Sequence, residues 1–300
     1  MSGTRVGTRS ALLDSGLFLD RRSLRQRLLT RELVDRLTTV CSPLFLLAVW
    51  QIAAMAGGID VRFFPAPSAI LATFGEMVRS GELLNCQGTF FAGAWCAGTT
   101  TIQGGHLAVS LGRISIGFLL GAIPGVVIGL AMGLFGPIRA AIQPLVDATF
   151  PIPKIAVLPL FIMILGIGEE SKYAIVASAV IYLVLINTVA GVRNIEKIYL
   201  DVGKNYHLGR QLMFTDVALP GAMPLIVAGL KLGLGVALLV IVAAEYVGAK
   251  AGIGYLIWTS WQVFQVEKMY VGLLITAVLG FASAVLLNFL ERKLVPWKGR

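Results

Sequence analysis

Six long apolar segments constrain this chain more than any other feature of its sequence. Each approaches the ~20 residues that a helix needs to cross a bilayer. The composition agrees, because only 14% of the residues are charged, against about 25% in soluble proteins. The sequence therefore predicts an all-α integral membrane protein with about six transmembrane helices. We place them at 37–58, 114–135, 150–168, 173–192, 222–246 and 270–290.

The distribution of positive charge predicts how these helices are oriented. Lysine and arginine gather on the cytoplasmic side of membrane proteins. The tails 1–36 and 291–300 and the long loop 193–220 hold most of these residues, whereas the loop 59–113 holds few. We therefore expect a multi-pass membrane protein with both termini and the long loop in the cytoplasm. This placement explains the net charge of +9 without a nucleic-acid partner.

The N-terminal tail is open to two interpretations. Leu24, Leu28 and Leu33 stand at helical spacing among charged residues, which is typical of an amphipathic helix lying on the inner leaflet. A disordered basic tail is the alternative. A secretory signal is not indicated, because the apolar residues are scattered among arginines and form no continuous core.

Glycines recur at every fourth position of the second span. Such a face lets helix backbones approach closely in lipid, where packing drives helix association. The fifth span repeats the spacing once. We expect these residues to mark close helix contacts. They are Gly117, Gly121, Gly125, Gly129 and Gly133 in the second span, and Gly229 and Gly233 in the fifth.

Two further spans carry residues that are unusual at membrane depth. Pro153 and Pro159 interrupt the third span, and a broken helix is tolerated in a membrane only where protein or a water-filled cavity surrounds it. Lys154 is expected to extend toward the membrane surface. Glu245 stands near the outer end of the fifth span, where it either lines a polar cavity or marks a wetted helix end. Pro153, Pro159 and Glu245 are therefore candidates for lining a transport pathway.

The sequence offers no catalytic constellation. His106 and His207 are the only histidines, and no metal-ligand cluster, nucleophile elbow or phosphate-binding loop is present. Cys86 and Cys96 share one hydrophilic loop, where a disulfide remains an open alternative. A protein of this kind that works against a gradient needs energy from an ion gradient or from another subunit.

The long loop carries a spaced pattern. It reads Asp201-Val202-Gly203, three residues, His207, nine residues, Val217, one residue, then Leu219-Pro220. The stretch 200–214 predicts a short amphipathic helix. The pattern resembles the cytoplasmic loop signature of binding-protein-dependent ABC importer permeases: Glu-Ala-Ala, three residues, Gly, nine residues, Ile, one residue, Leu-Pro. The spacing agrees throughout, but His207 replaces the central glycine. Gly209, two residues on, is the alternative position for the turn.

Other segments strengthen the resemblance and narrow it to the nitrate, sulfonate, taurine and bicarbonate branch. They include Ser110-Leu111-Gly112-Arg113, the proline-rich start of the third span, Ala244-Glu245 and Gly252-Ile253-Gly254. Together they cover roughly residues 65–297. The stretch 85–105 has no counterpart in the family pattern and looks like an insertion on the outer face.

The resemblance implies a type I ABC importer-like permease of the inner (plasma) membrane, with its core at 114–290. Two such subunits, identical or related, would form the pathway for a small anionic solute that a separate binding protein delivers. ATPase subunits would bind ATP and Mg²⁺, so this chain would hold no cofactor and be no enzyme. The helix at 201–212 would transmit their motion, with Asp201, Lys204, His207 and Arg210 in contact.

Three rival functions are weaker. An ion-coupled secondary transporter predicts clustered acids within the spans, and only Glu245 is visible there. A membrane-embedded enzyme lacks a catalytic cluster. A scaffold protein is compatible with the glycine faces alone, and association with an ATPase would distinguish it.

Overall fold

The part of the chain that a computed structural model describes comprises residues 38, 41–83 and 105–297. Its secondary structure is helical, with no strand in these ranges. The chain divides into two compact units, Met1–Ser68 and Ala69–Arg300. The expectations for the N-terminal tail, for Cys86 and Cys96 and for nearly all of the insertion 85–105 lie outside the described residues.

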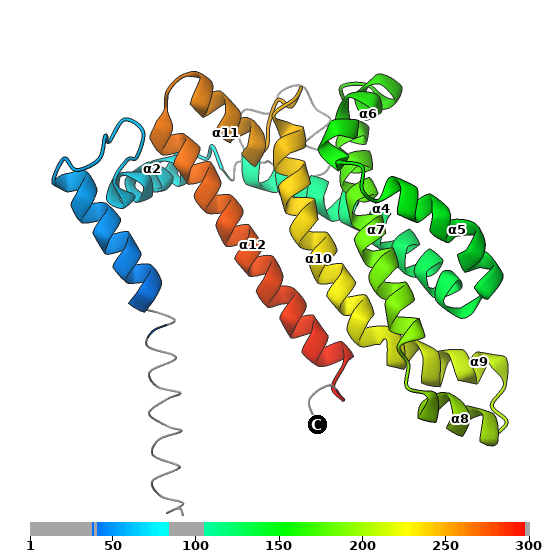
Figure 1. The fold of residues 1–300 in the computed structure, drawn as a ribbon. Helices are drawn as coiled ribbons and strands as arrows, with labels where there is room; N and C mark the ends of the chain where they lie inside the picture. Colours follow the sequence, from blue (N-terminus) through cyan, green and yellow to red (C-terminus); the bar gives the residue numbers. More distant parts are fainter. Residues whose placement is uncertain (1–37, 39–40, 84–104, 298–300) are drawn as a thin grey trace, which may run out of the picture. The chain divides into compact units, whose positions relative to one another are not determined.

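Four long apolar helices form the framework of the second unit. Each is long and apolar enough to cross a membrane. In Figure 1 they run side by side, and α7 packs against both α4 and α10. They are α4 (His106–Leu134), α7 (Glu169–Arg193), α10 (Leu219–Glu245) and α12 (Val266–Leu294).

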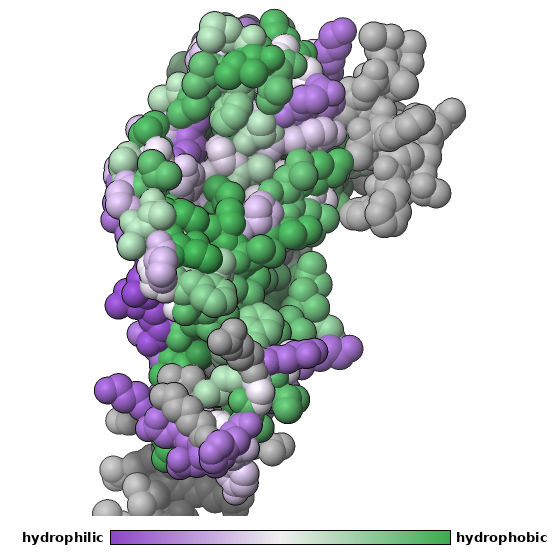
Figure 2. Space-filling view, turned by 90° about the vertical axis from the view of Figure 1, so that its right-hand side faces the viewer, coloured by the Kyte–Doolittle hydropathy of each residue, from purple (hydrophilic) through white to green (hydrophobic). Residues whose placement is uncertain are grey.

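The surface of this framework is suited to lipid. Large apolar side chains are widely exposed, among them Leu239 (67%), Ile123 (61%) and Phe281 (73%). On the face drawn in Figure 2, hydrophobic residues cover most of the middle and hydrophilic ones gather at the lower end. Since water would penalise such a surface, the exposed apolar belt supports the membrane assignment.

The predicted third span is not one continuous helix. The structure divides the region into α5 (Gly136–Thr149), a 3₁₀ turn (Lys154–Val157) and α6 (Leu158–Leu165). The two arms meet at an angle of 89°. The broken span therefore begins earlier than the predicted 150–168, at Gly136, and its second arm ends at Leu165.

The prolines explain this break. Proline has no N–H to donate and clashes with the preceding helical turn. Pro151 and Pro153 fall between the two helical arms, and Pro159 occupies the first turn of α6, where proline is tolerated. The bent pair counts as one broken span at most.

Not all six predicted spans appear as long, continuous helices in the described part of the chain. The described residues hold four, or five if the bent pair is one. The predicted first span is represented by the helix Cys41–Met55 of the first unit, which is shorter than a typical crossing. Residues 37, 39 and 40 at its predicted start lie outside the described part.

The shorter helices lie at the ends of the bundle. In Figure 1, α11 lies at one end of α10 and α12, while α8 and α9 lie at the opposite end. A π-helical turn, Met213–Ala218, joins α9 to α10 without a break. Their bounds are α2 (Pro67–Arg79), α8 (Lys197–Asn205), α9 (Arg210–Leu212) and α11 (Ile253–Gln262).

The glycines of α4 lie against α7 along its length. A Cβ added at Gly117 would stand 2.7 Å from the Cβ of Val176, and one at Gly121 would stand 2.5 Å from the carbonyl oxygen of Ala177. Gly125, Gly129 and Gly133 meet the next turns of α7 in the same way. No side chain fits between these two backbones.

The glycines of α10 lie against another side of α7. A Cβ at Gly229 would stand 2.7 Å from the Cβ of Asn187, and one at Gly233 would stand 3.2 Å from Val180. Helix α7 is thus held between two glycine faces. Its buried valines, Val180 and Val184, have no exposed surface.

We expect Gly121→Ala to destabilise the protein by about 1–3 kcal/mol, because the added methyl group overpacks against a backbone carbonyl that has no room to move. The matched control is Gly280→Ala in α12, where a Cβ meets nothing within 4 Å. Thermal unfolding of the purified protein in detergent measures both. Equal stability of the two variants would contradict this account of the interface.

Candidate functional site

The loop that carries the spaced pattern forms a helix, a tight turn and a second short helix. Helix α8 ends at Asn205, and His207 adopts a left-handed conformation with φ of 52°. The N–H of Leu208 donates to the carbonyl oxygen of Gly203 at 3.0 Å. A left-handed residue with this hydrogen bond ends a helix in a Schellman motif.

This geometry decides between the two positions considered for the turn. His207, which stands at the central glycine of the signature, takes the left-handed conformation, and Gly209 is not among the glycines with positive φ. The Nδ1 atom of His207 lies 3.1 Å from the carbonyl oxygen of Asn205. The predicted continuous helix at 200–214 is wrong, because this turn divides it into α8 and α9.

The acid and the glycine of the pattern differ in their exposure. Asp201 is exposed on α8, whereas Gly203 is buried under Met213. A Cβ at Gly203 would stand 2.7 Å from the Met213 sulfur. The start of the π-helical turn therefore packs directly on α8 at this position. The side chains of Lys204 and Arg210 lie outside what the structure describes.

A cavity of about 520 Å³ lies between α8 and the start of α10. Val202, Gly203, Val217 and Pro220 line it together with Trp297. Leu219 begins α10 beside it and packs against the core. The structure thus brings both halves of the spaced pattern to one place.

Helix α8 also exposes an apolar face that the sequence analysis did not single out. Ile198, Tyr199, Val202 and Tyr206 are 64%, 59%, 48% and 78% exposed. Tyr199 and Val202 share one side of α8, and Tyr206 directly follows the last residue of the helix. The helical spacing of these apolar residues is the sequence signal that indicates this face.

A buried charge network occupies the opposite end of the long helices. Arg113 of α4 binds Glu169 of α7 through two hydrogen bonds of 2.5 and 2.6 Å. It also binds Glu245 of α10 at 2.8 Å and the carbonyl oxygen of Ala251 at 2.6 Å. One guanidinium therefore joins three helices and the loop that follows α10.

Hydroxyl and backbone groups complete this network. The Ser110 hydroxyl donates to Glu245 at 2.7 Å and accepts from the Ile253 N–H at 2.8 Å. The Gly254 N–H donates to Glu245 at 2.8 Å, and the Gly252 N–H donates to the His106 ring at 3.1 Å. A Cβ at Gly252 would collide with the Glu245 carboxylate.

The network shows why three separate segments of the sequence carry the family resemblance. Ser110 and Arg113 come from one segment, Glu245 from another, and Gly252 to Gly254 from a third. Sequence reasoning treated them as separate markers and missed Glu169 altogether. An arginine beside an apolar span is the signal that predicts a buried acidic partner.

The expectation that Glu245 lines a pathway is wrong for this conformation. Its side chain is fully buried and every contact described above neutralises or hydrogen-bonds it. It is therefore neither a cavity residue nor a wetted helix end. Sequence position alone did not reveal Arg113 as its partner.

The two proline candidates lie at the break between α5 and α6, and both are exposed. Lys154 does not extend away as expected. Its ammonium donates to the carbonyl oxygen of Thr149 at 2.8 Å and lies 4.1 Å from the centre of the Tyr182 ring. A cation therefore lies between the broken span and α7.

Residues 125–296 match the family described as the binding-protein-dependent transport system inner membrane component. The chain belongs to this family. It is accordingly a permease subunit of an ABC importer, a multi-pass protein of the inner membrane and not an enzyme. Its partners include ATPase subunits and a solute-binding protein.

Three relatives agree with this assignment. SsuC of Bacillus subtilis (strain 168), named an aliphatic sulfonates transport permease, is 33% identical over 85% of this chain and 86% of its own. The taurine transport permease TauC of Escherichia coli (strain K12) is 31% identical over 85% and 87%. The nitrate import permease NrtB of Synechocystis sp. is 28% identical over 84% and 86%.

We expect His207→Gly to preserve the turn of this permease and His207→Val to disrupt it. A left-handed conformation costs roughly 1–2 kcal/mol for a residue with a Cβ and more for a β-branched one, whereas glycine adopts it freely. Hydrogen exchange of the backbone amides over 197–212 measures the turn, with Gln211→Val as control. Equal protection in the glycine and valine variants would contradict the assignment.

We expect Arg113→Ala to destabilise the permease by about 3–5 kcal/mol, because it leaves the fully buried carboxylate of Glu245 without its cation. The control is Glu82→Ala, which removes a half-exposed pair with Lys268 and costs about 1 kcal/mol or less. Chemical unfolding in detergent gives both values. A cost for Arg113→Ala no larger than the control would show that the network is not structural.

Proposed function

We propose that this permease imports a small anionic solute of the sulfonate, taurine, nitrate or bicarbonate class. The observation that carries the proposal is its similarity, over more than four-fifths of its length, to permeases named for aliphatic sulfonates, taurine and nitrate. Both termini and the α8–α9 loop lie in the cytoplasm, as the distribution of lysine and arginine favours.

Helices α8 and α9 form the contact with the ATPase. The exposed apolar side chains of Tyr199, Val202 and Tyr206 supply a surface that a cleft on a soluble subunit can cover. Polar and charged residues alternate with these apolar ones along the chain and are expected to contact the ATPase as well: Asp201, Lys204, His207 and Arg210. The turn at His207 fixes the angle between the two helices, and so fixes the shape that the ATPase recognises.

The working transporter contains a second permease subunit, identical or related. The resemblance to the family favours this arrangement, because two permeases enclose one pathway there. The glycine faces of α4 and α10 are already occupied by α7, so they are not the surface of association. Alternating access then follows from ATP-driven movement of the two α8–α9 loops, which requires their contacts to differ between the two states.

Uptake by the reconstituted importer tests the substrate class. Vesicles that contain this permease, its ATPase and its binding protein should accumulate a radiolabelled sulfonate or nitrate only with ATP inside. Excess unlabelled anions of each class, added outside, identify the preferred solute. Accumulation that follows an ion gradient without ATP would contradict the proposal.

We expect Val202→Asp to abolish co-purification of the ATPase, because it places a charge in the centre of the apolar face of α8. The matched control is Val247→Asp, which changes a half-exposed valine two residues beyond the far end of α10. Affinity purification of the tagged permease followed by quantification of the ATPase measures both. Equal ATPase recovery in the two variants would contradict the proposal that α8 contacts the ATPase.

A further inference from the structure

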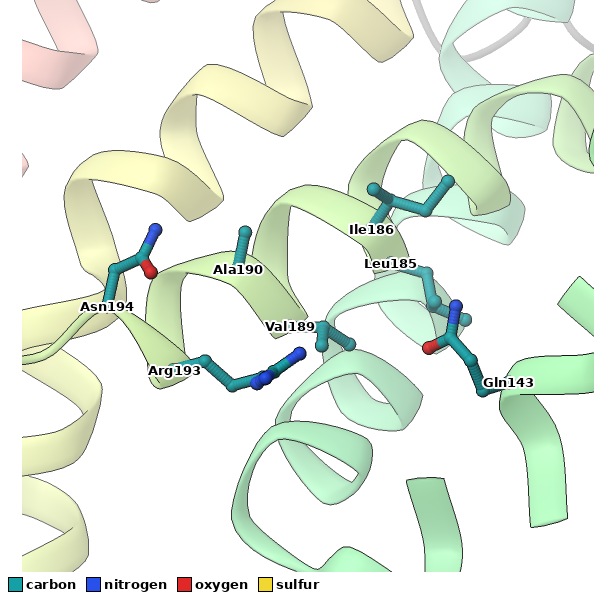
Figure 3. Close-up of a pocket in the computed structure, with 7 residues that line it drawn as sticks. All are labelled: Gln143, Leu185, Ile186, Val189, Ala190, Arg193 and Asn194. Atoms are coloured by element: carbon teal, nitrogen blue, oxygen red, sulfur yellow. The ribbon is translucent and has the colours of Figure 1, made fainter. Parts of the chain in front are cut away.

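A cavity of about 380 Å³ lies between α5 and α7, away from the charge network and from the α8 turn. Figure 3 shows the Arg193 side chain extending along α7 toward Val189, with Gln143 of α5 on the far side. Leu185 and Ile186 complete an apolar wall. The volume is far larger than the ~30 Å³ share of one water molecule in the liquid.

Arg193 is the charged group of this cavity, and it has no acidic partner among the described residues. Three other cations of the long helices have acidic partners: Arg113 pairs with two glutamates, Lys172 with Glu169 and Lys231 with Glu291. A guanidinium presents a planar fork of N–H donors that matches oxyanions. The cavity therefore offers its positive charge to a ligand.

The side of α7 that lines the cavity also meets the broken span farther along the helix. Tyr182, Ile186, Val189 and Arg193 follow helical spacing on that side, and Lys154 lies over the Tyr182 ring at its other end. No acid pairs with Lys154 in the described residues. A broken helix at membrane depth marks protein contact or a water-filled cavity, so this side of α7 is suited to a pathway for anions.

The lining also restricts the shape of the anion. Leu185, Ile186 and Val189 give an apolar wall beside the single cation. The Gln143 amide is already engaged, because its Nε2 donates to the exposed carboxylate of Asp147 at 2.8 Å. That carboxylate repels an anionic head at the α5 side and leaves Arg193 as the place for the head.

We propose that this cavity is a transit site for organic anions that carry a short apolar tail, with Arg193 binding the anionic head and α7 the tail. The inference rests on the proposed import of anions and narrows it, because an inorganic oxyanion would leave the apolar wall unused. Each methylene of the tail that leaves water strengthens binding by roughly two- to fourfold.

Protection of Arg193 from phenylglyoxal tests the site. The permease–ATPase complex in phosphatidylcholine nanodiscs is treated with the reagent, and mass spectrometry follows Arg193 and Arg79. Arg79 is the internal control, because it is also an exposed arginine in the last turn of a helix. The probes are hexanesulfonate, methanesulfonate and 1-hexanol.

We expect hexanesulfonate to protect Arg193 at far lower concentration than methanesulfonate, hexanol to protect neither residue, and Arg79 to react at an unchanged rate. Equal protection of Arg193 and Arg79 would overturn the proposal, since it would reflect ionic screening alone. Protection by phosphatidylglycerol in the nanodisc, with none from hexanesulfonate, would overturn it in favour of a lipid headgroup.

A variant that fills the cavity provides a second test of whether hexanesulfonate binds there. Ala190→Phe should abolish protection by hexanesulfonate, whereas Ala148→Phe on the exposed side of α5 should not. The unmodified complex remains decisive if Ala190→Phe does not fold. Failure of the ATPase to co-purify would refute the proposed function, whereas an intact complex without protection refutes only this site.

Discussion

The close packing of α7 between α4 and α10 is the contact on which the rest of this structure depends. Lipid gives no hydrophobic drive for helices to associate, so the fold relies on backbones that approach closely and on polar groups that pair. Glycines from both neighbours provide the first, and α7 supplies valines that fill the space. Without the packing of these three helices, neither the charge network around Arg113 nor the α8 turn would be held in a defined position.

The two ends of this unit are specialised differently. At one end Arg113 joins α4, α7 and the end of α10 through paired carboxylates. At the other, the chain leaves α7 through Arg193 and forms the α8 turn. A helix of 25 residues spans about 37 Å. A displacement imposed on α8 therefore reaches the network through one rigid helix, and the buried ion pairs oppose any independent rotation of its far end.

Sequence patterns predicted much of the helix packing and of the loop, because regular spacing of residues can be recognised without knowledge of the fold. The glycine spacing indicated the packing face, and the loop spacing located α8 and the start of α10. Pairings across the fold were not predicted: Arg113 and Glu169 lie 56 positions apart, and Arg113 and Glu245 lie 132 apart. The break at Pro153 was visible in the sequence, but the 89° angle between its two arms was not. Likewise, His207 looked like a departure from a glycine rule, yet its backbone follows the rule.

The distribution of charge pairing separates the structural part of the permease from the part suited to solute. Buried ion pairs add little net stability. They favour one arrangement of the helices, because any arrangement that leaves a buried charge unpaired is costly. Cations of the network are all held by acids, so they cannot bind an anion without disrupting the fold. Arg193 and Lys154, in contrast, lie on the side of α7 where α5 and α6 break, and the fold does not need their charge for pairing. A pathway for anions is therefore expected along this side, where releasing a ligand breaks no structural ion pair.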